Sequence, residues 1–271
     1  MSVNGGESEH ASRHPDFAAS AWTRAPYLFQ HIPTALGIED VSFERVADIV
    51  AAMPPQDIIY RGAGGGVNSQ MTRLSLPDWS AVPLHARLAA ETTSLMLQNV
   101  ERYDAEFRTA VDRLIEWAAR TLSVSPRQFK YCTASIFLSS PGAISSYHTD
   151  REQNFLVHLH GQKTVHVFPR RLSVQQELLV AMFRRRKGIY FEYDPTLELA
   201  ASLYTLRPGN ILYVPRNWPH WVDNSDQVAM SLSINFFRPA DFLLEQFYQL
   251  NDKLRARFTR VFRPRITRAG G

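Results

Sequence analysis

Cysteine is nearly absent from this chain of 271 residues, in which Cys132 is the only one. A single thiol excludes an internal disulfide and a cysteine-rich zinc or iron–sulfur site. No run approaches the roughly 18 consecutive apolar residues that a membrane span needs. The first twenty residues are polar and lack the apolar core of a secretory signal. We therefore expect a cytoplasmic protein without a membrane segment.

Basic residues outnumber acidic ones only slightly, 30 against 26, but they gather toward the C-terminus. From Asp252 onward, seven arginines and lysines stand against one acid. Such a tail can follow phosphates, yet no signature of a nucleic-acid-binding fold accompanies it. We therefore expect a solvated helix face here and no nucleic-acid partner.

The first half of the chain combines an irregular start with helical patterns. Residues 1–16 show no periodicity, which predicts a flexible leader. Ser42 is expected to cap a short amphipathic helix. A strand over residues 58–60 runs into the glycine-rich turn 62–66, which lacks the frame of a phosphate-binding loop. Residues 84–122 carry a helical pattern throughout.

From residue 131 the apolar pattern changes to period two, which predicts short strands. An insert over residues 169–208 interrupts them, and a final helix with apolar residues at helical spacing begins at Asp241. The sequence therefore predicts a mainly β protein whose barrel-like core has flanking helices. The predicted strands cover residues 131–138, 154–159, 163–168, 210–214 and 228–237.

Three side chains are placed to bind one metal ion. His148 and Asp150 are two residues apart, so on an extended backbone they point to the same side. His220 follows 72 residues after His148, in a loop bounded by prolines at the end of an apolar strand. Two histidines and one carboxylate form the facial ligand set of non-haem iron(II) oxygenases, although manganese and zinc accept the same ligand types.

The residues around this ligand set resemble a known family. The run 148–169 contains His148, the carboxylate two residues later, and Lys163 fifteen residues later. It resembles the Jumonji C (cupin-like) 2-oxoglutarate oxygenases, and most of all the subgroup that contains the hypoxia-inducible-factor asparaginyl hydroxylase. The resemblance extends over Ser145–Phe237 and is weak before it.

This resemblance implies a fold and an assembly. The core would be a double-stranded β-helix (jelly roll), with N-terminal helices packed outside it. The oxygenase domain would cover residues 17–240 after the leader 1–16, and residues 241–271 would form a C-terminal helix with a basic tail. The apolar stripe of that helix exceeds what a barrel edge needs to cover, so we expect a homodimer. The alternative is a helix that folds back on its own barrel.

The resemblance also implies the cofactors. Iron(II) would be the metal, 2-oxoglutarate the cosubstrate and O2 the oxidant. Lys163 and Ser145 would hold the distal carboxylate of 2-oxoglutarate, while Asn154 and Asn235 would lie near its inner carboxylate. Independently, residues 161–162 suit a tight hairpin turn that returns Lys163 toward the cavity, and a buried lysine needs an anionic partner.

Two features depart from the relatives. Met96 stands where the asparaginyl hydroxylase has a further tyrosine for the distal carboxylate, so that contact is missing. Ribosomal oxygenases share an opening like residues 22–26 but carry a long C-terminal winged-helix region. The 51 residues after His220 are too few for such a region.

The resemblance favours hydroxylation of an unactivated C–H bond in an amino-acid side chain of a peptide or protein. A free or carrier-bound amino acid, or another small metabolite, is the alternative substrate, and a modified RNA base is a distant third. Trp218 and Trp221 flank the second histidine and could shape the substrate mouth. Arg184 and Arg185, in the insert, could grip an acidic peptide or a carboxylate.

Two other classes of function stay open. One is a metal-binding cupin without catalysis, acting as a sensor or scaffold, although Lys163 argues against it. The other is a zinc hydrolase, for which Glu152 is the nearest candidate general base. Among the remaining polar residues, His158 is expected to be a hydrogen-bonded barrel histidine, and Cys132 a core residue.

Overall fold

The computed structural model describes most of the chain. The predicted leader 1–16, most of the insert around Arg184 and Arg185, and the basic tail from residue 251 lie outside the described residues. The described residues are 17–31, 36–38, 40–69, 72–170, 189–190, 192–244, 246–247 and 250.

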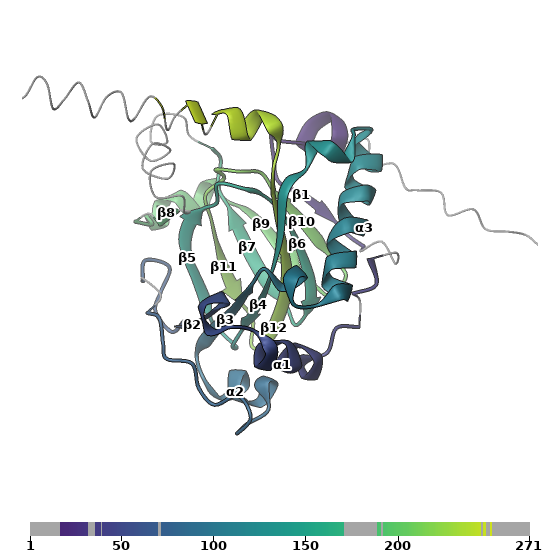
Figure 1. Cartoon of the computed structure of the whole chain (residues 1–271). Helices are drawn as coiled ribbons and strands as arrows, with labels where there is room; N and C mark the ends of the chain where they lie inside the picture. The colour runs from purple at the N-terminus through teal and green to yellow at the C-terminus, as the bar shows by residue number, and fades with distance from the viewer. Residues whose placement is uncertain are drawn as a thin grey trace, which may run out of the picture.

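Two antiparallel sheets face each other across the core (Figure 1). Together they form the predicted mainly β, cupin-type double-stranded β-helix. The larger sheet has the strand order β1 (Tyr27–Phe29), β10 (Ile211–Val214), β6 (Gln153–His160), β12 (Ala229–Phe237), β4 (Lys130–Ser139), β3 (Thr93–Gln98) and β2 (Ile58–Gly62). The smaller sheet has the order β8 (Ile189–Tyr190), β5 (Ile144–Thr149), β11 (His220–Asn224), β7 (Lys163–Val167) and β9 (Ser202–Leu206).

The helices lie outside the larger sheet (Figure 1). Ser42 caps α1 (Phe43–Ala52) as predicted, and Asp104 caps the long helix α3 (Ala105–Leu122). A short helix, α2 (Leu84–Ala90), lies between them in the chain. Shorter helical segments are η1 (Phe17–Ala21), η3 (Pro55–Asp57), η4 (Val100–Arg102), η5 (Pro126–Gln128) and η6 (Pro195–Ala200). No helix of the described part of the chain is long and apolar enough to span a bilayer.

The two faces of the larger sheet bury different cores. Along β6, Phe155 and Val157 point outward into the large core that they share with the helices. Leu156, which alternates with them, packs with a smaller cluster between the sheets. Buried members of that inner cluster come from both sheets and are Val165, Val167, Leu206, Leu212 and Val214. The space between the sheets is the barrel interior, where the predicted site lies.

Two predictions about the elements were wrong in part. The helical pattern over 84–122 contains the strand β3, because the buried residues Thr93, Leu95 and Leu97 alternate within it. The end of the insert 169–208 is also ordered, since β9 extends the smaller sheet beside β7. The five strands predicted after residue 130 are confirmed, with ends shifted by one residue at most.

Candidate metal and cosubstrate site

The strand β11 brings the predicted metal ligands together. Its first residue, His220, pairs with His148 on β5 and with Val167 on β7. Directly paired residues of neighbouring antiparallel strands point to the same side of a sheet. Both imidazoles therefore lie on the inner face, and Asp150 follows at the end of β5.

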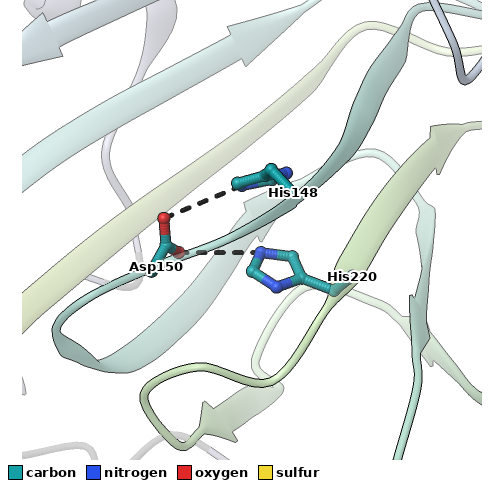
Figure 2. A group of neighbouring side chains, drawn as sticks. All are labelled: His148, Asp150 and His220. Carbon is teal, nitrogen blue, oxygen red and sulfur yellow. Dashed lines mark ion pairs between the residues drawn. The ribbon is translucent and has the colours of Figure 1, made fainter. Parts of the chain in front are cut away.

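Asp150 lies to one side of the two imidazole rings and faces both of them (Figure 2). Its Oδ1 is 3.8 Å from Nε2 of His148, and its Oδ2 is 3.6 Å from Nε2 of His220. One ligand atom from each residue lies within 4.8 Å of the other two. Three converging ligands on one side of a metal leave other coordination positions open for small molecules.

Backbone carbonyls fix the orientation of both rings. Nδ1 of His148 donates to the carbonyl oxygen of Ser146 at 2.7 Å, and Nδ1 of His220 donates to that of Trp218 at 2.9 Å. A carbonyl only accepts, so each Nδ1 carries the proton and each Nε2 presents its lone pair toward Asp150. This is the tautomer that a metal-binding histidine needs.

Burial keeps His220 in the form that binds metals. Desolvation of the buried ring, and then the neighbouring His148, hold the pKa of His220 well below its usual value, although Asp150 opposes them. A neutral imidazole is the ligand form. The ring needs no deprotonation at neutral pH before it can coordinate a metal.

Lys163 lies on the same inner face, farther along the barrel. It is the register partner of Asn224 on β11, four residues after His220, which corresponds to about 13 Å along the strand. The side chain is only 4% exposed. Desolvation lowers the pKa of Lys163 to about 8. Within the described part of the chain, no carboxylate forms an ion pair with this ammonium group.

Ser145 reaches the inner face through an irregularity in β5. β11 pairs with β7 in continuous register, but its pairing with β5 shifts between His220 and Val222. The bulge therefore lies in β5, and it makes Ser145 the partner of the inward Val222. The hydroxyl of Ser146, the next residue along β5, instead donates a hydrogen bond to the backbone carbonyl of Ser69.

The two predicted asparagines form a cross-strand pair on the larger sheet. Asn154 on β6 is the partner of Asn235 on β12. The hydroxyl of Ser233 donates to Oδ1 of Asn154 at 3.1 Å and lies 3.4 Å from Oδ1 of Asn235. Sequence reasoning missed Ser233, although its position two residues before Asn235 on one strand was a usable signal. Met96 lies on the same inner face of this sheet, paired with Phe137.

The two tryptophans take different positions. Trp218 packs against the inner cluster of the barrel. Trp221 follows His220 directly, so it points away from the ligands, and its ring stacks on His166 with centroids 3.7 Å apart. This outward position argues against Trp221 as part of a mouth above the metal. Arg184, like Arg185, lies outside the described residues.

Two further polar residues of the predicted site, His158 and Glu152, each have a partner in the structure. Nε2 of the fully buried His158 donates to the carbonyl of Gly161 at 3.0 Å, and its Nδ1 accepts from Ser231 at 2.8 Å. His158 is therefore the predicted hydrogen-bonded barrel histidine. Glu152 lies two residues after Asp150 and is paired with Arg151 at 3.7 Å, an arrangement that does not mark it as a free general base.

The barrel interior thus combines two features with different chemistry. One is a set of three ligands for a divalent metal, and the other is a buried ammonium group on the same face. An anion that coordinates the metal and extends toward Lys163 would neutralise that charge. The ligand set and the buried cation, which has no carboxylate partner in the described part of the chain, together fit a metal with an elongated dicarboxylate.

A scan of family models identifies the class of fold. Residues 18–242 match the cupin-like domain family. The chain belongs to this family, which confirms the cupin-like resemblance seen in the sequence. A search of the curated proteins finds no match.

Solved structures of one bacterial protein share the fold. The Escherichia coli ribosomal oxygenase YcfD aligns with a TM-score of 0.55 at 18% identity, over 91% of this chain and 57% of that one. Its complexes with cobalt and succinic acid and with cobalt and 2-oxoglutarate each align with a TM-score of 0.54 at 18% identity, over 95% of this chain. They are covered over 61% and 62% of their length, so this chain spans about three fifths of them.

Proposed function

We propose that this protein is an iron(II)- and 2-oxoglutarate-dependent dioxygenase that hydroxylates an unactivated C–H bond of an amino-acid side chain in a peptide or protein. The observation that carries the proposal is the buried ammonium of Lys163, which has no carboxylate partner among the described residues and lies on the face that holds the three metal ligands. A protein that bound only a metal would gain nothing from this buried charge, because burying a charge without a partner lowers the free energy of unfolding.

Each residue of the candidate site would have a role in such an enzyme. His148, Asp150 and His220 would hold the iron, and Lys163 would bind the distal carboxylate of 2-oxoglutarate with help from Ser145. When bound, the iron and 2-oxoglutarate supply the oxidising chemistry with O2. The protein orients these groups and excludes water from them.

The amides of the site would act on the inner end of the cosubstrate. Asn154 and Asn235 lie side by side, with the hydroxyl of Ser233 between their oxygens. That hydrogen bond to Asn154 orients its amide so that the NH2 group points away from Ser233. The NH2 group can then donate to a carboxylate oxygen.

A first experiment tests the cofactor pair. Protein loaded anaerobically with iron(II) and 2-oxoglutarate should develop a weak visible charge-transfer band. Asp150→Ala and Lys163→Ala should each abolish it at limiting 2-oxoglutarate. Lys130→Ala is the matched control, because Lys130 is exposed on β4, and it should keep the band. Bound metal without a band in the wild type would favour a metal-binding scaffold or a zinc hydrolase and overturn the proposal.

A second experiment tests the substrate class. The similar structures of a ribosomal oxygenase support a protein substrate, and a small metabolite is the alternative. Cell extract is divided by ultrafiltration, and each fraction is incubated with enzyme, iron(II), 2-oxoglutarate and labelled oxygen gas. Succinate release and label incorporation confined to the macromolecular fraction are expected. Turnover confined to the filtrate would favour the metabolite.

We also propose a homodimer formed through the C-terminal helix, whose described part covers residues 239–244, 246–247 and 250. Leu243 is 68% exposed and Leu250 is 58% exposed, a large apolar exposure for one helix. Leu243→Glu combined with Leu250→Glu should convert a dimer to a monomer in light scattering. Leu199→Glu, at a side chain 97% exposed elsewhere on the surface, is the control. A monomeric wild type would exclude the dimer.

A further inference from the structure

A buried carboxylate, that of Asp241, links the start of the C-terminal helix to the turn at Asp150 and to the loop that precedes His220. The side chain is only 3% exposed. Desolvation raises its pKa, but the contacts with Arg238, Gln153 and Arg216 outweigh this and lower it below the usual value. Asp241 is therefore a charged acceptor with three neighbours, each of which belongs to a different segment.

The first connection leads to the turn that presents Asp150. Nε2 of Gln153 donates to Oδ2 of Asp241 at 3.0 Å. Gln153 is the first residue of β6 and follows Asp150 by three positions. Its Oε1 accepts from the hydroxyl of Tyr213 at 2.6 Å and from the backbone N–H of Arg216 at 3.3 Å. The buried side-chain amide of Gln153 thus holds the start of β6 in place through hydrogen bonds at both its NH2 group and its oxygen.

The second connection leads to the loop that presents His220. Nη1 of Arg216 donates to the backbone carbonyl of Asp241 at 3.2 Å and lies 3.5 Å from its Oδ1. Arg216 belongs to the loop between β10 and β11. In the same loop, the N–H of Asn217 donates to the backbone carbonyl of Asp150 at 2.8 Å. The loop before His220 therefore holds the turn at Asp150 as well.

The third connection leads to the helix itself. The Arg238 guanidinium binds both oxygens of Asp241, at 2.8 and 3.0 Å, and its backbone N–H donates to Oδ2 at 3.2 Å. A carboxylate that reaches back to the N–H at a helix start is a capping interaction. This connection involves no segment that carries a metal ligand, so it separates the role of Asp241 in the helix from its role toward the site.

We propose that Asp241 is a positioning residue for the metal centre, which holds Gln153 and Arg216 so that Asp150 and His220 stay at ligand distance from each other. It is not one of the three candidate ligands, and it acts on them through Gln153 and Arg216. The inference rests on the proposed function only in that the three ligands bind a divalent metal. It adds that the C-terminal helix, seen at the top of Figure 1, is coupled to the affinity of that site.

The test measures metal affinity without any catalysis. Cobalt(II) is titrated into metal-free full-length protein, and the visible absorption of the bound ion gives the dissociation constant. Asp241→Asn should weaken cobalt binding about tenfold, the lower end of the range for partners of metal ligands. Arg238→Gln removes the two guanidinium contacts of the helix connection, keeps the contacts of Asp241 with Gln153 and Arg216, and should leave the affinity within about twofold. Asp226→Asn is the surface control, since Asp226 is exposed.

Thermal melting of the metal-free variants separates positioning from general stability. Asp241→Asn and Arg238→Gln are both expected to lower the melting temperature, but only the former should lower the affinity. Equal cobalt affinity in Asp241→Asn and the wild type, or equal losses in both variants, would overturn the proposal. A wild type that binds no cobalt would instead overturn the proposed function.

If Asp241→Asn does not fold, a second variant tests the same proposal. Gln153→Met removes the connection next to Asp150 and leaves the three charges of Asp241, Arg216 and Arg238 in place. It should weaken cobalt binding in the same way. Unchanged affinity in this variant would show that the connection through β6 does not position the ligands.

Discussion

Lys163 and His158 are close neighbours inside the barrel, and both carry a cost of burial. Desolvation, and after it the positive charge of Lys163, lower the pKa of His158 to about 3. Desolvation also lowers the pKa of Lys163 to about 8. The histidine therefore stays neutral, and the lysine is the one cation of the pair. Its charge remains available for an anion that enters from the side of the metal ligands.

Lys163→Met should stabilise the metal-free protein while it abolishes binding of the cosubstrate. The depressed pKa means that the charged form is disfavoured at pH 7 by about 3 kcal/mol relative to an unfolded chain, since the usual value is 10.5. Methionine fills a similar volume without a charge. Urea unfolding at pH 7 should show a gain of up to about 3 kcal/mol. A loss of stability would mean that the ammonium already has a partner.

The pH dependence of stability should report His158. Its pKa is about 3 when folded and near 6.5 when unfolded, so the unfolded chain binds the extra proton between these values. The contribution of His158 to the free energy of unfolding is therefore fully present above pH 6.5. It decreases as the pH falls, by about 2 kcal/mol at pH 5. His158→Gln should flatten this part of the curve in urea unfolding. His85→Gln, at an exposed position, should leave the slope as it is in the wild type.

The pattern of the sequence was sufficient for most of the barrel but not for all of it. Five of the strands after residue 129 (β4, β6, β7, β10 and β12) were predictable because alternating apolar residues mark a strand with one buried face. β3 was not, because six residues between two helices look like part of a longer helical pattern. β11 carries His220, Trp221 and Asp223, and so little apolar alternation that only its pairing with two neighbours makes it a strand.

The residues of the site also fall into those that could be predicted from the sequence and those that could not. The ligands and Lys163 follow from spacing along extended segments, which the sequence contains. The bulge that turns Ser145 inward does not, because it depends on the register between β5 and β11. Asp241 was also beyond prediction, since its contact with Gln153 joins residues 88 positions apart. Local patterns carry no signal for such a contact.

Gly161→Ala should disturb the hairpin that presents Lys163. Gly161 has a φ of 72°, and a Cβ there would lie 2.5 Å from the backbone oxygen of Val228. Left-handed strain and the clash together should cost about 2 to 4 kcal/mol in urea unfolding. Gly142→Ala is a matched control, because Gly142 has a φ of 65° and open space around it. Its loss should be only about 1 to 2 kcal/mol, and equal losses would show that the contact with Val228 is unimportant.

Metal binding should stabilise the fold through the carboxylate of the ligand set. Cobalt(II) at a hundredfold excess over its dissociation constant adds about 2.7 kcal/mol, which corresponds to a rise of about 5 to 10 °C in the melting temperature of a protein this size. Asp150→Asn should lose most of this rise, because an amide oxygen is a weaker, uncharged ligand. Asp223→Asn, on the exposed outer face of β11, should keep it. An equal rise in both variants would show that the ion binds elsewhere, and the assignment of Asp150 as a ligand would fail.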